Sequence, residues 1–376
     1  MSVGAISTSY GTTANNIETN WHFVQCHSGG ITPVNLSNYI IDIAVTNSND
    51  ITLDNCKVGI KNREPEKWEV IFSSDGRVKL NECTIKGIVY APNGDTEIEK
   101  CLIQGKVDGR SAPVTLITTE IRSPDYTKYA TVPESGFGEW INALKDHDDE
   151  IYQFTTTDIE RYSNLLEMNT ERYGLYHIAI STDDNDIECR QQCKIYGDII
   201  NDVLDIENPT RDIKVFDSMI AGSIVNRTGS TLLERSSAKA VYSNTQKTEV
   251  NNSDVGFIYS VNSDTHINNH SVIKHGAMLG GMMNRISSST LHGSVQLKGQ
   301  TLTIEDHSII DKVCLPQPHE VRGEFDFTEI RLNSGSTLHA IETEGQRCRL
   351  FIGKDAVFTP LNTGEPIPAN VEIHFI

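Results

Sequence analysis

Three stretches of the chain repeat one residue pattern: CTIKGIV at Cys83–Val89, CLIQGKV at Cys101–Val107 and CKIYGDI at Cys193–Ile199. Serine replaces the cysteine in two further copies, SMIAGSI at Ser218–Ile224 and STLHGSV at Ser289–Val295. Residue frequencies predict roughly a tenth of one such match by chance in a chain of this length. The five matches therefore indicate a structural repeat.

Weaker copies, in which the glycine is displaced or replaced, extend the repeat. They begin at Cys56, Ser237, Ser253, Ser271, Ser308 and Ser336. The starting positions 218, 237, 253, 271, 289 and 308 lie 19, 16, 18, 18 and 19 residues apart. The polar tracts between copies are typical of turns.

Each copy is interpreted as a short strand, a glycine bend and a second short strand. The cysteine or serine and the aliphatic residue two positions later share one strand face, because side chains alternate across a strand. A unit of about 18 residues cannot bury its own apolar face, so successive copies must stack. We predict an all-β solenoid of parallel strands in which Cys83, Cys101, Cys193, Ser218 and Ser289 form an internal ladder.

The repeat resembles the short coils of bactofilin-type polymer-forming proteins and, more loosely, of pectate-lyase-like right-handed parallel β-helices. The resemblance covers about residues 50–110 and 193–315 and is one of fold. A left-handed hexapeptide helix would need an aliphatic residue every six positions, whereas Ile85 is followed by Ala91 and Glu97. The expected fold is therefore a right-handed parallel β-helix. Self-association is what the resemblance to the polymer-forming proteins implies.

The composition limits the classes of molecule that the protein can bind. The 376 residues carry a formal net charge of −19, which would repel nucleic acids and anionic lipids. Residues 1–18 lack the pattern of a secretory signal, and no apolar run is long enough to span a membrane. The eight cysteines are neither dense nor arranged as CxxC pairs, so we expect cytoplasmic folding, with non-classical export left open.

The repeat divides the chain into five parts. We expect a cap and an irregular first coil over 1–49, coils over 50–122, an insertion over 123–192, coils over 193–324 and a closing coil and cap over 325–376. Within the insertion the spacing becomes helical. Trp140, Ile141 and Leu144 form one apolar stripe, and Ile159, Tyr162, Leu165 and Leu166 form another. A mostly α-helical insertion is predicted, either docked on the solenoid or presented to a partner.

One set of polar residues is a candidate catalytic site. Stacking would bring Lys274, His292 and Asp311 to neighbouring coils on the outer face, with His270 and His307 beside them as candidate substrate-binding residues. An imidazole between an ammonium and a carboxylate suits general acid–base chemistry. The alternative is a solvated polar face, which every solenoid needs, and we weigh it about four to one over a site.

Other candidate chemistry is weaker. The acidic segment 183–188 has oxygen ligands at alternate positions but lacks the glycine and the final glutamate of a calcium loop. The repeated cysteines occupy an inward slot, where a thiol behaves as a buried apolar group. The catalytic signatures of polygalacturonate hydrolases are not found in their arrangement. No metal and no cofactor is predicted.

Three functions remain open. The leading hypothesis is a non-enzymatic scaffold that associates with itself or presents the insertion to another protein. The alternative is a carbohydrate-active enzyme or glycan-binding protein that uses the face around His292. A host-directed effector that contacts its target through the insertion is the weakest of the three.

Overall fold

The structure is a computed structural model that describes residues 24–25, 33–41, 44–63, 65, 69–123, 178–182, 185–201, 211–244, 246–318, 327–333 and 335–376. The chain divides into two compact units. Unit 1 is Met1–Thr131 with Tyr173–Val225, and unit 2 is Val132–Arg172 with Asn226–Ile376. No helix among the described residues has the length and apolar character that a membrane span needs.

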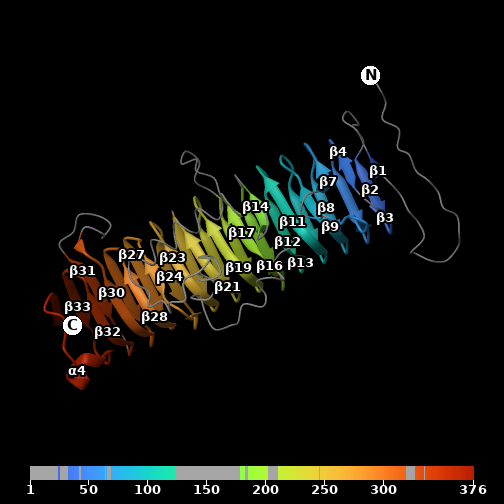
Figure 1. Cartoon of the computed structure of the whole chain (residues 1–376). Helices are drawn as coiled ribbons and strands as arrows, with labels where there is room; N and C mark the ends of the chain where they lie inside the picture. Colours follow the sequence, from blue (N-terminus) through green and yellow to red (C-terminus); the bar gives the residue numbers. More distant parts are fainter. Residues whose placement is uncertain are drawn as a thin grey trace. The chain divides into compact units, whose positions relative to one another are not determined.

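In each unit the strands belong to two sheets, called sheet A and sheet B, and neighbouring strands in the described ranges pair in parallel. In unit 1, sheet A contains β1 (Val24–Gln25), β3 (Ile40–Ile41), β4 (Val45–Asn47), β6 (Lys57–Val58), β7 (Glu69–Ser73), β9 (Thr84–Tyr90), β11 (Leu102–Arg110), β13 (Glu120–Arg122), β14 (Ile178–Thr182), β16 (Lys194–Tyr196), β17 (Asp198–Asn201) and β19 (Met219–Asn226). Sheet B contains β2 (Val34–Ser37), β5 (Ile51–Asp54), β8 (Val78–Asn81), β10 (Thr96–Glu99), β12 (Val114–Ile117), β15 (Ile187–Arg190) and β18 (Ile213–Phe216). Figure 1 shows neighbouring strands of this unit as parallel arrows, in blue to green.

Unit 2 repeats the arrangement. Its sheet A contains β21 (Ser237–Ser243), β23 (Asp254–Ser260), β25 (Val272–Ile273), β26 (Ala277–Leu279), β28 (Thr290–Leu297), β30 (Ile309–Leu315), β32 (Thr337–Thr343) and β34 (Val357–Phe358). Its sheet B contains β20 (Thr231–Glu234), β22 (Lys247–Asn251), β24 (Asp264–Asn268), β27 (Met283–Ser287), β29 (Thr301–Glu305), β31 (Thr328–Leu332), β33 (Cys348–Ile352) and β35 (Val371–Phe375). A short helix, α4 (Thr359–Thr363), follows β34.

One coil of unit 1 illustrates the repeat. Strand β10 of sheet B ends at Glu99, Lys100 turns the chain with a φ of 50°, and Cys101 leads into β11 of sheet A. The bend within β11 falls at Gly105, which pairs with Gly87 of the preceding coil. A Cβ at Gly105 would lie 2.0 Å from the carbonyl oxygen of Gly87, so the stacking of coils requires glycine there.

The core consists of inward rows of aliphatic side chains. Leu80 and Ile98 stack in sheet B, and Ile85 and Ile103 stack in sheet A; all four side chains are fully buried. Neighbouring residues on these strands face outward and carry charge, as in the ion pair of Lys79 with Glu97. The parallel, all-β solenoid predicted from the sequence is therefore confirmed in its coarse form.

The insertion needs a correction. The helical stripes of Trp140 to Leu144 and Ile159 to Leu166 lie outside the described residues. In the described part of 123–192 no α-helix occurs; instead β14 and β15 are regular coil strands. The parallel pairings of β14 with β11 and of β15 with β12 show that the coil pattern resumes by Ile178, before the Cys193 expected from the sequence. The repeat pattern missed this because no cysteine or serine anchor precedes β14.

Candidate functional site

The residues at the start of each sheet A strand form a hydrogen-bonded row, which we call the slot ladder. In unit 1 the Cys56 amide donates to Cys83 Sγ at 3.4 Å, the Cys83 amide to Cys101 Sγ at 3.3 Å, and the Cys101 amide to Thr119 Oγ1 at 3.4 Å. Further along unit 1, the Cys193 amide donates to Ser218 Oγ at 3.1 Å. Each slot side chain therefore accepts a hydrogen bond from the neighbouring coil.

Unit 2 builds its slot ladder from serine. The Ser236 amide donates to Ser253 Oγ at 3.0 Å, and the Ser253 amide donates to Ser271 Oγ at 3.2 Å. The row continues from Ser289 to Ser308, again at 3.2 Å, and from Ser308 to Ser336 at 3.1 Å. The slot residue of the first coil is Ser236, not the Ser237 expected from the repeat, because Ser237 already begins β21.

The residue before each slot residue has a positive φ, which turns the chain from sheet B to sheet A. This left-handed conformation is uncommon for residues other than glycine. The corner residues are Asn55 (48°), Glu82 (54°), Lys100 (50°), Thr118 (49°), Gln192 (66°), Asp217 (50°), Arg235 (49°), Asn252 (47°), His270 (65°), Ser288 (49°), His307 (64°) and Gly335 (69°). His270 and His307, proposed from the sequence as substrate-binding residues, are thus corner residues.

The slot thiols are poor nucleophiles. The structure raises the pKa of Cys56, Cys83 and Cys193 and lowers only that of Cys101. Hydrogen bonding with Cys101, together with burial, raises the pKa of the Cys83 thiol to about 12. Hydrogen bonding with Cys83 and burial raise the pKa of Cys56, and burial raises that of Cys193. The hydrogen bond with Cys83 lowers the pKa of Cys101, yet its side chain is only 3% exposed. A catalytic thiol must be both ionised and accessible, and none of these is.

The predicted catalytic residues lie on successive coils. Ile273 pairs with Leu291, and Leu291 pairs with Ile310, so the next residues, Lys274, His292 and Asp311, follow one another along the stack.

Their contacts do not form a closed site. His292 Nδ1 lies 3.5 Å from Asp311 Oδ2, which also accepts the Gly293 amide at 2.9 Å. Lys274 Nζ instead lies 3.6 Å from Asp254 Oδ2. The side chains of Lys274, His292 and Asp311 are 52%, 54% and 42% exposed, so water screens the contacts between them.

Metal binding finds no support in the described ranges. They contain no cluster of three or more histidine, cysteine, aspartate or glutamate side chains that could hold a metal ion. Of the acidic segment 183–188, the first two aspartates lie outside the described residues. Asp186 Oδ1 accepts the Asp212 amide at 2.7 Å, which is a bond between coils.

The last strand of sheet B exposes side chains of a row that is buried on the strand beside it. Val371, Ile373 and Phe375 of β35 pair with Cys348, Leu350 and Ile352 of β33, which are 0%, 0% and 5% exposed. The three residues of β35 therefore continue the inward row of the core. Phe375 is nevertheless 74% exposed, and Ile373 is partly exposed. On the other sheet, α4 packs against β32 (Figure 1).

The outer edge of β35 also carries unused backbone groups. The Cys348 amide donates to the Asn370 carbonyl, and the Ile376 amide donates to the Ile352 carbonyl. In a parallel ladder alternate residues point to the same neighbour, so Glu372 and His374 face β33 while Ile373 and Phe375 direct their backbone groups away from it. No described strand pairs with this edge.

The first strand of sheet B in unit 1 presents the matching edge. The amides of Val34 and Asn38 donate to the carbonyls of Asp50, just before β5, and Asp54, at its end. Alternation therefore leaves the backbone groups of Asn35 and Ser37 pointing away from β5. Leu36 pairs with the fully buried Leu53 and is itself partly exposed. Among the described strands, β2 pairs with β5 alone. The alternation V-x-I-x-F at 371–375 indicates an inward row in the closing coil expected over 325–376, but neither open edge was predicted from the sequence.

Comparison with known proteins adds no family. The chain matches no protein-family model, no curated protein and no solved structure. The resemblance to bactofilin-type and pectate-lyase-like coils is therefore supported by the parallel solenoid alone.

Proposed function

We propose that this protein is a non-enzymatic scaffold that associates head to tail with further copies of itself, the edge of β35 in one copy pairing with the edge of β2 in the next. The exposed inward row of β35 carries this proposal. An open strand edge is a template for strand addition, and proteins that remain monomeric usually protect such edges.

The two edges are complementary in their backbone and their core. A strand added to β35 must direct alternate backbone groups toward Ile373 and Phe375, and β2 directs those of Asn35 and Ser37 outward. In the same register Val34 and Leu36 would continue the row of Val371 and Ile373. Both strands belong to parallel sheets, so the new pair would be parallel as well. Right-handed winding is retained in this proposal because crossovers between parallel strands are nearly always right-handed.

The test measures the mass of the full-length chain by light scattering over a range of concentrations. Wild type is expected to form a concentration-dependent series, and Phe375→Lys is expected to remain monomeric because a charge then sits in the inward row. His374→Lys is the matched control, since its side chain lies on the outer side of the same strand. A wild-type chain that stays monomeric, or equal masses for Phe375→Lys and wild type, would refute the proposal.

A mixing experiment fixes the direction of assembly. Leu36→Lys blocks the β2 edge and leaves β35 open, whereas Phe375→Lys does the reverse. Each variant alone is expected to be monomeric, and an equal mixture is expected to form a dimer and nothing larger. Assembly by Leu36→Lys alone would instead indicate symmetric pairing between two β35 edges.

A second candidate is glycan binding at the outer face around Lys274, His292 and Asp311, with His270 and His307 alongside. The contact of His292 with Asp311 supports it. The test is a glycan array with the full chain and with His292→Ala. Binding that the substitution removes would favour this function, and no binding to any glycan would end it.

A further inference from the structure

The turn between β9 and β10 contains the only asparagine–glycine pair in the sequence, Asn93–Gly94. Asn93 is exposed and lies in neither strand. In such a pair the backbone nitrogen of the glycine can attack the side-chain amide carbon of the asparagine, because glycine has no side chain to hinder the approach. Residue types alone thus mark Asn93 as the asparagine most open to this reaction.

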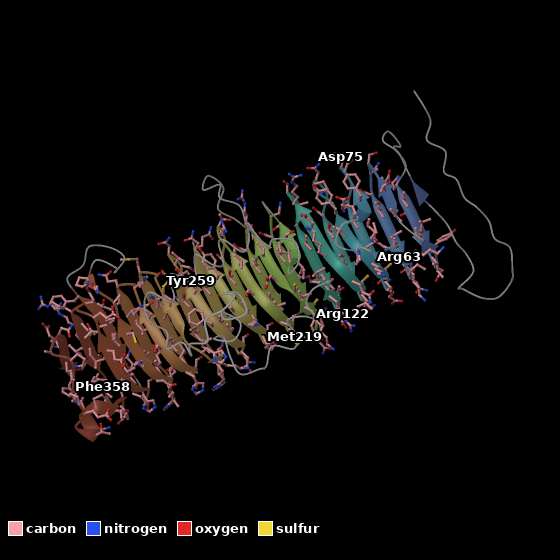
Figure 2. The ribbon with its side chains drawn as sticks, in the orientation of Figure 1. Arg63, Asp75, Arg122, Met219, Tyr259 and Phe358 are labelled. Atoms are coloured by element: carbon pink, nitrogen blue, oxygen red, sulfur yellow. The ribbon has the colours of Figure 1, made fainter. Side chains whose placement is uncertain are left out.

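The stacking of coils requires the glycine of this pair. A Cβ at Gly94 would lie 1.9 Å from the carbonyl oxygen of Gly76 in the preceding coil. Because Val78 pairs with Thr96, Asp75 and Gly76 occupy the positions of Asn93 and Gly94 in that coil. Figure 2 labels Asp75 at the upper margin of the strands of unit 1, where its side chain is exposed. The fold therefore keeps beside Asn93 the residue type that hinders the attack least.

The attacking nitrogen is also free to react. Among the described residues, the amide of Gly94 has no hydrogen-bond partner. Two asparagines that precede a serine differ in this respect or in exposure. Asn47, before Ser48, is only 4% exposed. The amide that follows Asn252 donates to Ser271 Oγ at 3.2 Å. The structure therefore favours reaction at the asparagine–glycine pair over these two asparagine–serine pairs.

We propose that Asn93 is a site of spontaneous deamidation. The Gly94 nitrogen loses its proton to solvent and forms a bond to Asn93 Cγ, the Cγ–Nδ2 bond breaks, and the amide leaves as ammonia after taking up a proton. Water then opens the resulting five-membered imide at one of its two carbonyls. The product is either aspartate or isoaspartate, in which the main chain runs through the former side chain. One water is consumed for each ammonia released, and no oxidant or cofactor enters the balance.

The two products differ in how they fit the turn. Asn93 Nδ2 donates to the Ser74 carbonyl at 2.7 Å, and both products lose this donor. Asp75 shows that the same turn accepts an aspartate. Isoaspartate in addition lengthens the main chain by one carbon beside Gly94, where even a Cβ has no room. We therefore expect isoaspartate to open the turn between β9 and β10 and aspartate to leave it closed.

The test follows the folded, full-length chain during incubation at mildly alkaline pH, where more of the attacking nitrogen is deprotonated. Peptide mapping by mass spectrometry reads the loss of the Asn93 amide, with Asn47 and Asn252 as internal references. Most chains are expected to lose the amide at position 93 alone, and to lose it more slowly at mildly acidic pH. Retention of this amide in the folded chain, while a urea-unfolded sample loses it, would overturn the proposal. Equal loss at all three positions would overturn it as well, because it would indicate reaction in the unfolded chain.

Two variants separate the effects of the two products, and neither measurement depends on self-association. Asn93→Asp supplies the aspartate directly, and Asn93→Gln keeps an amide that could close only a less favourable six-membered ring. Limited proteolysis within 91–95 is expected for aged wild type, with labelling by an isoaspartyl methyltransferase enriched in the cut chains. Fresh Asn93→Asp and aged Asn93→Gln are expected to resist. Equal cutting of either variant and aged wild type would refute the opening of the turn by isoaspartate.

Discussion

The slot ladders of the two units solve one structural problem with different atoms. In unit 1 the slot holds Cys56, Cys83 and Cys101, and in unit 2 it holds only serine. Cys83 Sγ approaches the carbonyls of Asn81 at 3.1 Å and Leu53 at 3.5 Å and accepts one amide. Ser271 Oγ does the same with Asn268 at 2.6 Å and Val250 at 3.1 Å.

The comparison shows what the slot requires. A side chain there must be small, must offer its one hydrogen to a nearby carbonyl and must accept the amide of the neighbouring coil. Thr119 in unit 1 meets the same conditions, with Oγ1 3.1 Å from the Ile98 carbonyl and 3.0 Å from that of Ile117. The thiol and the hydroxyl differ in the strength of these bonds and in acidity, so alkaline pH and substitution of the slot residue should affect the two units differently.

Alkaline pH should separate the units most strongly. In folded unit 1 the pKa values of Cys56, Cys83, Cys189 and Cys193 are raised and that of Cys101 is lowered, which leaves a net excess of raised thiols. In unit 2 only Cys314 and Cys348 are described with raised values. Stability from a raised thiol pKa is present below the unfolded value near 9 and is lost as pH rises above it. Each thiol ionised only in the unfolded chain costs about 1.4 kcal/mol per pH unit.

Between pH 9 and 11 unit 1 is therefore expected to open before unit 2. Limited proteolysis with mass spectrometry of the fragments locates the first cuts. Cys83→Ser should delay the cuts in unit 1, because it removes the thiol whose pKa is raised to about 12. First cuts within unit 2 would contradict this account.

Removal of the polar slot atom should have the next largest effect. Ser271→Ala leaves the buried Ser253 amide without its acceptor and removes the hydroxyl bonds to the Asn268 and Val250 carbonyls, so the free energy of unfolding should fall by about 1–3 kcal/mol. Cys83→Ala removes the weaker bonds of a thiol and should cost less hydrogen-bond energy, although its lost packing adds a cavity cost. Urea denaturation of both variants at pH 7 measures the difference. An equal loss of unfolding free energy in the two variants would mean that the slot residue stabilises the fold by packing and not by hydrogen bonding.

Exchange of one slot atom for the other should have the smallest effect. Cys83→Ser places in unit 1 the residue that unit 2 uses at the same position, so at pH 7 the change should stay below about 1 kcal/mol. Thermal denaturation followed by circular dichroism measures it. A loss as large as that of Cys83→Ala would show that the units differ in backbone geometry as well as in slot chemistry.

The repeat could be read from the sequence because it depends on local spacing. A small residue, an aliphatic residue and a glycine placed the slot of Cys83 and Cys101 correctly. Ser236 was missed in favour of Ser237, because its coil is 17 residues long and carries no glycine at the bend position. Thr119 was missed because the pattern admitted only cysteine and serine.

Features that depend on contacts between residues of different coils could not be predicted from local residue spacing. Tyr242 and Tyr259, which pair on the outer side of sheet A, follow the alternation of any outer row, and only their burial is unusual. The register of Lys274, His292 and Asp311 followed from the repeat, but their exposure and the pairing of Lys274 with Asp254 did not. The open edge of β35 likewise depends on which backbone groups find partners, and residue types do not encode this directly.

The recurrence of one corner geometry makes the number of coils adjustable. Asn252 and His270 both turn the chain with a positive φ immediately before a slot serine, at Ser253 and Ser271. Excision of residues 253–270 would join Asn252 to Ser271 and recreate an equivalent corner. The side chains on both sides of the junction would keep their inward or outward orientation. Gene duplication or loss of one such module would change the length of the stack by a single 4.8 Å step and leave its terminal strands intact. The length of such a stack can therefore evolve by whole coils.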